Sequence, residues 1–386
     1  NTGGLVGSSY VSGVGNGITG NSYWNSQTSG QATSSGGEGR TTLEMTYPTA
    51  SNTYIMWDFD NIWAQDISGS INNGYPYIAF EIDYTKPVSI APISGSGTAV
   101  SPYQINSLGN LYWITEDSSR WDKHYVQTTD IDASSTINWG ALGWSPIGNS
   151  TTKFTGSYDG GGYNISELYI NRPNTDNIGL FGYTNASRIK DLNLLEVSIT
   201  GKNQTGALVG YHDASSIIEN CIVNGSVTGV ADKTGSLVGY NNNSSAINNC
   251  SGQGSVIGSG TYTGGLAGYN DYGSSMNCCT TNSSVIGVNA VGGLAGSNIN
   301  TSYIVNSSSK GYVNATGNSS GGLVGENRGY SSMIANSYSR CSVNGVSYVG
   351  GLAGGNYLGI ISNSYSTGSV SGTGNTGGLV GSSYVS

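Results

Sequence analysis

The sequence predicts an all-β protein, a parallel β-solenoid of 28–29-residue coils with short helical or aromatic plugs at its ends. Right-handed winding is expected. Composition is the first reason, because Gly contributes 62 of 386 residues and charged residues only 9%, against ~25% in typical soluble domains. Gly, Asn, Ser and Thr are weak helix formers, which argues against a helix-rich fold. The second reason is a leucine motif that recurs at nearly constant spacing.

The leucine motif reads (Gly/Ala/Ser)-Leu-(Val/Ala/Phe)-Gly and returns every 27 to 29 residues. Each repeat holds three short β-type runs between turns, which is too little to bury a face alone. Stacked copies bury a shared core, and like residues then lie ~4.8 Å apart along the stack. The leucines are expected to form one core ladder: Leu180, Leu208, Leu237, Leu266, Leu294, Leu323, Leu352 and Leu379.

The position after each ladder leucine from Leu208 onward is small and apolar. Neighbouring strand residues point to opposite faces, so two interpretations are open. Either a bend turns both positions inward, or the stripe is exposed and mediates lateral contact between chains. Exposure of Val209 and Ala267 below ~10% excludes the exposed stripe.

Two polar columns accompany the leucines. The asparagines of an Ile-x-Asn-(Cys/Ser) motif are expected to stack and to hydrogen-bond along the axis. They are Asn220, Asn249, Asn306, Asn336 and Asn363. Tyr211, Tyr240 and Tyr269 also share a column, and their rings either pack on one another or dock sugars.

Residues 1–12 and 375–386 both read NTGGLVGSSYVS. This shift of 374 residues indicates a tandem array whose first turn is present twice. Residues 1–37 are therefore interpreted as the terminal coils of a preceding solenoid unit. Residues 121–386 are interpreted as the solenoid of this unit.

The segments between these solenoid stretches differ in composition. Residues 38–81 are aromatic-rich and are predicted to plug a solenoid end, because an open sheet edge invites aggregation. The capping-box pattern at 41–44 predicts one short helix there. Residues 82–102 form a Pro/Ser/Gly connector, and apolar residues at steps of three predict a capping helix within 103–120. The plug aromatics are Trp57, Phe59 and Trp63.

Several stretches resemble the GLUG-repeat family of microbial surface proteins, including Gly-Gly-Leu-Val-Gly at 321–325 and Ile-Ser-Asn-Ser-Tyr-Ser-Thr-Gly-Ser-Val at 361–370. The segments 130–132 and 154–160 resemble the opening coils of pectin-lyase-like β-helices. The resemblance implies a parallel β-solenoid in an extracellular or cell-surface protein, often a very long adhesin or surface-layer protein.

No enzymatic activity is expected. The five acids of residues 200–386 form no column that could supply an acid/base pair. Some GLUG proteins carry a zinc peptidase, but neither His124 nor His212 lies in the His-Glu-x-x-His motif that it needs. Calcium is the one cofactor considered, as an alternative to a solvated surface. Its candidate ligands are the paired carboxylates Asp58, Asp60, Asp130 and Asp132.

Cys221, Cys250 and Cys279 share one column. Neighbouring coils fall within the Cα range of a disulfide, ~4.4–6.8 Å. Stacked side chains point in parallel, however, which suits that bond poorly. Buried thiols are expected, with one inter-coil disulfide as the alternative.

Charge and hydropathy restrict the partners. Residues 200–386 hold five acids and five bases, so no basic footprint for nucleic acid is present. The segment contains no run of ~18 apolar residues, so no membrane span is predicted in it. The expected partners are copies of the chain itself, head to tail and laterally. The function expected is a structural extracellular fibre, sheath or stalk; the alternative is an adhesin that binds glycans through Tyr- and Asn-rich faces.

Overall fold

The computed structural model describes residues 20–59, 62–67, 69, 72–78 and 86–384. The chain divides into two compact units, residues 1–84 and residues 85–386. The twelve-residue repeat at 1–12 and the calcium candidate Asp60 lie outside the described residues, as do residues 79–81 of the predicted plug.

The first unit consists of short elements around an aromatic cluster. Its strands and helices are β1 (Tyr23–Asn25), α1 (Ser26–Ser29), β2 (Glu38–Arg40), α2 (Thr42–Met45), β3 (Trp63–Ala64) and β4 (Tyr77–Ile78). The predicted helix is α2, and its capping box joins Thr41 to Glu44 in both directions. Trp57 contacts Trp63 with ring centroids 4.0 Å apart, and Tyr54 lies between Trp57 and Phe59.

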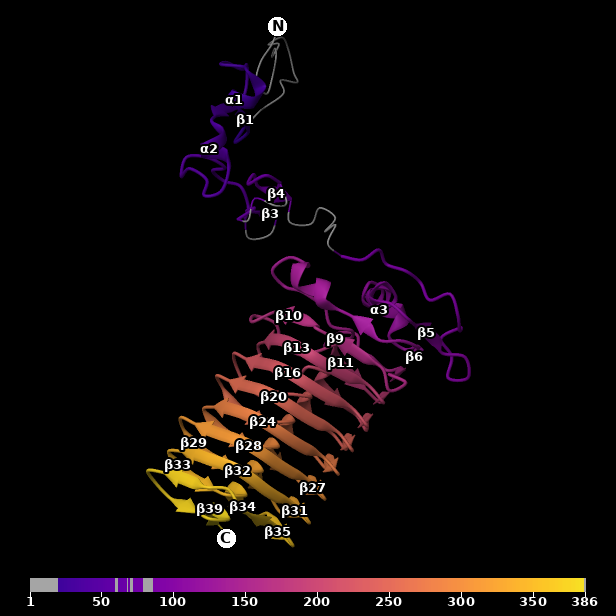
Figure 1. Cartoon of the computed structure of the whole chain (residues 1–386), viewed down its shortest axis with the longest axis vertical. Helices are drawn as coiled ribbons and strands as arrows, with labels where there is room; N and C mark the ends of the chain where they lie inside the picture. Colours follow the sequence, from indigo (N-terminus) through magenta and orange to yellow (C-terminus); the bar gives the residue numbers. More distant parts are fainter. Residues whose placement is uncertain (1–19, 60–61, 68, 70–71, 79–85, 385–386) are drawn as a thin grey trace. The chain divides into compact units, whose positions relative to one another are not determined.

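The second unit begins with the element that covers one end of the solenoid. Residues 86–102 contain no helix or strand. They lead into β5 (Tyr103–Ile105), α3 (Leu108–Thr115), η1 (Ser118–Arg120) and η2 (Ser134–Asn138). Leu111 and Ile114 of α3 are fully buried in the same apolar cluster as the solenoid core, and α3 lies at the end of the stack where its first strands are (Figure 1). A helix is thus present within the segment 103–120, and it closes the first turns.

The described part of the second unit is a parallel β-solenoid, as the sequence predicts (Figure 1). From residue 230 onward each complete turn contributes strands to four parallel sheets, not the three runs expected. The additional one is a strand of two to four residues that precedes each ladder leucine from Leu237 onward. Its residues are mostly Gly, Ser and Thr, so the sequence shows no alternation of apolar and polar side chains that would indicate a strand.

We name the four sheets by a recurring feature of their strands. From β14 (Val209–Asp213) onward the strands of the leucine sheet start directly after a ladder leucine, and the isoleucine sheet carries a column of mostly isoleucines. The leucine sheet comprises β11 (Phe181–Asn185), β14 (Val209–Asp213), β18 (Val238–Asn241), β22 (Ala267–Asn270), β26 (Ala295–Ile299), β30 (Val324–Arg328), β34 (Ala353–Tyr357) and β39 (Val380–Tyr384). The isoleucine sheet comprises β5, β6 (His124–Gln127), β8 (Ser157–Asp159), β12 (Arg188–Lys190), β15 (Ile217–Glu219), β19 (Ala246–Asn248), β23 (Ser275–Asn277), β27 (Tyr303–Val305), β31 (Met333–Ala335) and β35 (Ile360–Ser362).

Along the chain from residue 230 onward, each complete turn passes through the short-strand, leucine, isoleucine and long-strand sheets in that order. The long-strand sheet comprises β7 (Ile131–Asp132), β9 (Asn164–Ser166), β10 (Tyr169–Asn171), β13 (Asn193–Gly201), β16 (Ile222–Gly229), β20 (Ser251–Gly258), β24 (Thr280–Gly287), β28 (Ser308–Ala315), β32 (Tyr338–Gly345), β36 (Tyr365–Ser366) and β37 (Val370–Gly372). The short-strand sheet comprises β17 (Thr234–Gly235), β21 (Thr261–Gly264), β25 (Asn289–Gly292), β29 (Asn318–Gly321), β33 (Ser347–Gly350) and β38 (Thr376–Gly377).

Each strand pairs in parallel with its counterpart one turn away. In the long-strand sheet the register runs without a slip from Asn224 through Gln253 and Asn282. It continues through Lys310 to Arg340. At a strand spacing of ~4.8 Å, the nine turns of the described solenoid rise roughly 40 Å. Among the described residues no helix is both long and apolar enough to cross a membrane.

Candidate functional site

The ladder leucines lie at the corner between the short-strand sheet and the leucine sheet. The N–H of Leu237 donates to the carbonyl oxygen of Leu266 at 3.0 Å, and Leu266 donates to Leu294 at 2.8 Å. The same bond links each later ladder leucine to the next. The side chains are fully buried from Leu180 to Leu352, whereas Leu379 in the last turn is 40% exposed. Each leucine therefore stacks directly on the leucine of the neighbouring turn.

The residue after each leucine also points inward. Val209 and Ala267 are both 0% exposed. The carbonyl oxygen of Leu237 accepts two bonds, from the N–H groups of Leu208 and Val209. Because two successive N–H groups donate to one carbonyl oxygen, the backbone bends at this corner. The interpretation as an exposed apolar stripe for lateral contact is therefore wrong.

The predicted asparagine column is an exposed ladder on a tight turn. Asn249 donates from Nδ2 to Oδ1 of Asn220 at 2.8 Å, and the Asn336–Asn306 bond is 3.4 Å long. All five asparagines have φ between 46° and 55°, the left-handed region that Asn tolerates better than most residues. Cys278, also at φ 55°, interrupts the ladder, and Asn306 donates to Asn277 instead. The backbone conformation thus explains why Asn recurs here.

A second asparagine ladder is buried, and the sequence analysis missed it. The Nδ2 of the first four members donates to the Oδ1 of the next turn at 2.7–2.8 Å, and every member donates to a carbonyl oxygen of its own turn at 3.0–3.4 Å. The signal was present as an Asn four residues after the ladder leucine. Its members are the buried Asn241, Asn270, Asn298 and Asn327 and the half-buried Asn356.

His212 occupies the position of this ladder one turn before Asn241. Its Nδ1 lies 2.8 Å from Oγ1 of Thr184, and the ring is 0% exposed. Burial lowers the pKa of His212 to about 3, because the charged imidazolium would be taken out of water. The histidine is therefore neutral in the folded protein at pH 7.

The tyrosine column is packed rather than free. Tyr211 contacts Tyr240 with centroids 4.7 Å apart, and Tyr240 contacts Tyr269 at 5.3 Å. Tyr240 is 8% exposed and donates from its hydroxyl to Asp271 at 2.8 Å. Lys233 Nζ lies 4.4 Å from the centre of the Tyr240 ring. These contacts bury the Tyr240 ring, whereas Tyr211 and Tyr269 are half-buried.

The cysteine column consists of buried free thiols. Cys221, Cys250 and Cys279 form no disulfide. The N–H of Cys221 donates to Sγ of Cys250 at 3.4 Å. In the following turns Ser307 makes the same contact through its hydroxyl, accepting from the N–H of Cys279 at 3.1 Å. Burial raises the pKa of the Cys250 and Cys279 thiols. The thiols therefore fill a structural hydrogen-bonding position.

The calcium candidates that the structure describes do not converge. Asp130 accepts from the N–H of Asn164 at 2.8 Å, and Asp132 accepts from the N–H of Ser134 at 2.8 Å. Hydrogen bonds from Ser134 lower the pKa of Asp132. Asp58 lies in the first unit, and no group of three or more His, Cys, Asp or Glu side chains among the described residues could hold a metal ion.

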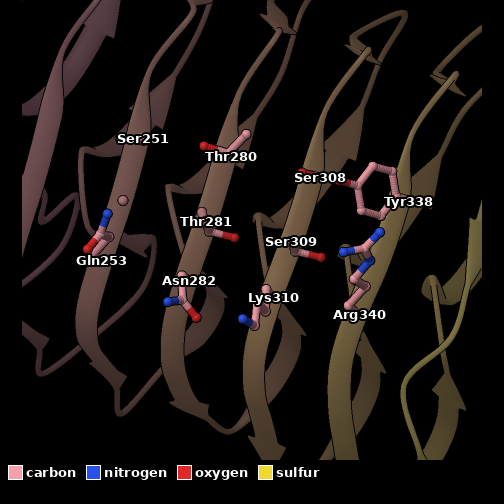
Figure 2. Close-up of a pocket in the computed structure, with 11 residues that line it drawn as sticks. Ser251, Gln253, Thr280, Thr281, Asn282, Ser308, Ser309, Lys310, Tyr338 and Arg340 are labelled. Carbon is pink, nitrogen blue, oxygen red and sulfur yellow. The ribbon is translucent and has the colours of Figure 1, made fainter.

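An open groove of about 230 Å³ crosses the outer face of the long-strand sheet (Figure 2). Four outward side chains from four successive strands lie in a row along it (Figure 2). They are Gln253 of β20, Asn282 of β24, Lys310 of β28 and Arg340 of β32. The sequence analysis did not single out this row, because its side chains differ from turn to turn.

Glycines next to this row set the shape of the strands. Gly254 has φ 111° and Gly311 has φ 118°, values that L side chains rarely adopt. A Cβ on Gly311 would lie 2.2 Å from the carbonyl oxygen of Ser283. These positions therefore need Gly, and they place a kink in β20 and β28 immediately after Gln253 and Lys310.

The described geometry defines a class, a parallel β-solenoid whose turns pivot on Gly-Leu-(Val/Ala)-Gly corners. The family model for the GLUG motif matches residues 345–371, which include the corner at Leu352. The chain is thus a β-solenoid that carries the GLUG motif.

Two relatives share part of this chain. Halomucin of Haloquadratum walsbyi is 44% identical over 142 residues, which is 36% of this chain and 2% of halomucin. A protein of Evansella cellulosilytica described as a Gly-rich membrane protein is 33% identical over 133 residues, or 33% of this chain and 15% of that protein. The chain therefore spans only a small part of either relative.

A solved structure from Bacteroides ovatus, described as an immunoglobulin A1 protease, aligns with 73% of this chain and 86% of its own. The identity is 17% and the TM-score 0.48.

Proposed function

We propose that the chain is one unit of an extracellular structural solenoid whose units join head to tail into a fibre, sheath or stalk. The observation that carries the proposal is the parallel pairing of each strand with its counterpart in the next turn, in a constant register from β16 to β32. Such a stack directs its backbone hydrogen bonds along one axis, the direction in which a fibre bears load. The likeness to halomucin and to a protein described as a membrane protein supports a surface location.

The two ends of the solenoid differ in a way that suits this assembly. The first turns are closed by α3, with Leu111 buried. In the last turn Leu379 is 40% exposed and Ile361 is only partly buried, although the leucines above Leu379 and the isoleucine above Ile361, Ile334, are fully buried. An exposed apolar end with unpaired strands favours a further layer of chain. In the proposed array that layer comes from the next unit.

Electron microscopy of concatenated units tests this proposal. Chains of one, two and three 374-residue units should appear as straight rods whose length increases by a constant amount per unit. A matched chain in which a flexible Gly/Ser linker follows residue 386 should give beads at variable angles. Variable angles between units in the chain without the linker would contradict head-to-tail joining.

A further inference from the structure

From β16 to β37 the long-strand sheet presents a face with cations and no carboxylates. The described strands of this sheet in that range contain no Asp or Glu, and its acids Asp132 and Glu196 lie in the earlier strands β7 and β13. Their charged residues are Lys310 and Arg340, which lie in neighbouring turns. The whole chain carries a net charge of −9. Two adjacent cations without counter-charge on this acidic chain therefore mark a local positive site.

Both cations are free to bind an anion. Neither Lys310 nor Arg340 forms an ion pair with any residue in the described part of the chain. Both side chains are exposed. The guanidinium carbon of Arg340 lies 5.0 Å from the centre of the Tyr338 ring, and Tyr338 stacks on Tyr365 at 5.1 Å and 8°. This aromatic pair holds the Arg340 head group in place.

The rest of the row supplies neutral hydrogen-bonding groups. Gln253 and Asn282 continue the register of the two cations and are exposed. Tyr312, two residues beyond Lys310 on the same face, is 42% exposed. Amides pair with hydroxyl groups, and an exposed ring packs on the apolar face of a sugar. From Gln253 to Arg340 the row spans three strand spacings, roughly 14 Å, which is longer than a single small anion.

We propose that this groove binds an acidic polysaccharide whose chain lies along the solenoid axis. Lys310 Nζ and the Arg340 guanidinium bind a carboxylate or sulfate group of the polymer, since Arg pairs with such oxyanions through two parallel hydrogen bonds. Asn282 and Gln253 bind hydroxyl groups of neighbouring sugars. An acidic polysaccharide is favoured over nucleic acid because the neutral amides of Gln253 and Asn282 match the hydroxyl groups that every sugar presents, whereas a nucleic acid presents mainly phosphates.

Calorimetry on the single 386-residue chain tests the site, so the result does not depend on assembly into fibres. The probes are polygalacturonate, dextran sulfate, neutral dextran and a single-stranded oligonucleotide at 20 mM salt. We expect at least one acidic polysaccharide to bind, and binding to weaken at least tenfold in the Lys310→Asn/Arg340→Asn variant. This variant repeats the Asn that already stands at Asn282, so the fold is retained and circular dichroism verifies it.

Lys202→Asn is the control for the single variant Lys310→Asn, because each removes one positive charge and Lys202 lies in an exposed turn outside the groove. Binding should be unchanged in this variant. Three results would overturn the proposal: equal binding of neutral dextran, equal loss in Lys202→Asn, or no binding of either acidic polysaccharide. Tighter binding of the oligonucleotide through Lys310 and Arg340 would also overturn it, in favour of nucleic acid.

Discussion

At the scale of single residues, the solenoid depends on polar side chains that repeat one contact in every turn. Asn270 and Asn298 are fully buried, yet each amide bonds to the next amide and to a backbone carbonyl oxygen. A buried amide without such partners would destabilise the fold by ~1–3 kcal/mol. The ladder therefore fixes the register, because a slipped turn would leave these groups unpaired.

Replacing His212 with Asn should make the stability less dependent on pH. Burial lowers the pKa of His212 to about 3 from an ordinary value of 6.5. The unfolded chain takes up the proton below pH 6.5 and the folded chain does not, so stability is full above pH 6.5 and falls as the pH drops toward 3. Between pH 7 and pH 4 this costs about 3 kcal/mol.

Urea unfolding at the two pH values measures this effect. The native chain should lose about 3 kcal/mol more than His212→Asn does between pH 7 and pH 4. An equal loss in both proteins would show that His212 is not a buried neutral member of the ladder.

Replacing Cys278 with Asn should stabilise the protein by about 1 kcal/mol, since Asn tolerates the left-handed conformation better than Cys. The new amide would also bridge Asn249 and Asn306, which Cys278 now separates. Cys278→Ser is the control, because it removes the thiol without supplying an amide. Equal urea midpoints for the two variants would contradict the role of the exposed ladder.

At the scale of the turn, the unit of folding is a coil that buries its leucine only between neighbours. This explains why Leu266 is 0% exposed and Leu379 is 40% exposed although both occupy the same ladder position. Turns in the middle of the stack are covered on both sides, and the last described turn is covered on one side. The free energy gained by burying a ladder leucine therefore depends on the turns above and below it and not on its own turn.

Truncating these two leucines should give very different losses of stability. Leu266→Ala should cost about 3 kcal/mol, because it opens a cavity in a closed stack. Leu379→Ala should cost less than ~1 kcal/mol, because the side chain is already partly in water. Thermal or urea unfolding of the 386-residue chain provides the comparison. Equal costs would mean that the last turn is covered as fully as the middle ones.

The features that could be predicted from sequence are those that depend on spacing. Leucines 27 to 29 residues apart specify the coil length and hence the stacked core. The corner at Val209 could not be decided, because strand alternation predicts an outward side chain and a bend predicts an inward one. The row from Gln253 to Arg340 was not recognised because its chemistry changes in each turn, and only the register brings the four side chains together.

At the scale of the whole solenoid, order along the axis comes from the backbone and from neutral side chains. Residues 200–386 carry five acids and five bases, too few to define the stack by ion pairs. Hydrogen bonds and apolar burial respond little to salt, in contrast to exposed ion pairs. The charges that remain are local features, such as the cations of the groove.

The central claim is that successive repeats lie directly on one another, and distances between spin labels test it most directly. In a Cys278→Asn background the other four cysteines are buried, so nitroxides attach only to cysteines introduced at exposed sites. Asn224 and Arg340 are four strand spacings apart, and Arg188 and Ile360 are six apart.

Double electron–electron resonance on these two pairs should give backbone separations of about 19 Å and about 29 Å, which is ~4.8 Å for each turn. Distances that fail to increase from four turns to six, or that spread broadly in both pairs, would contradict the stacked solenoid.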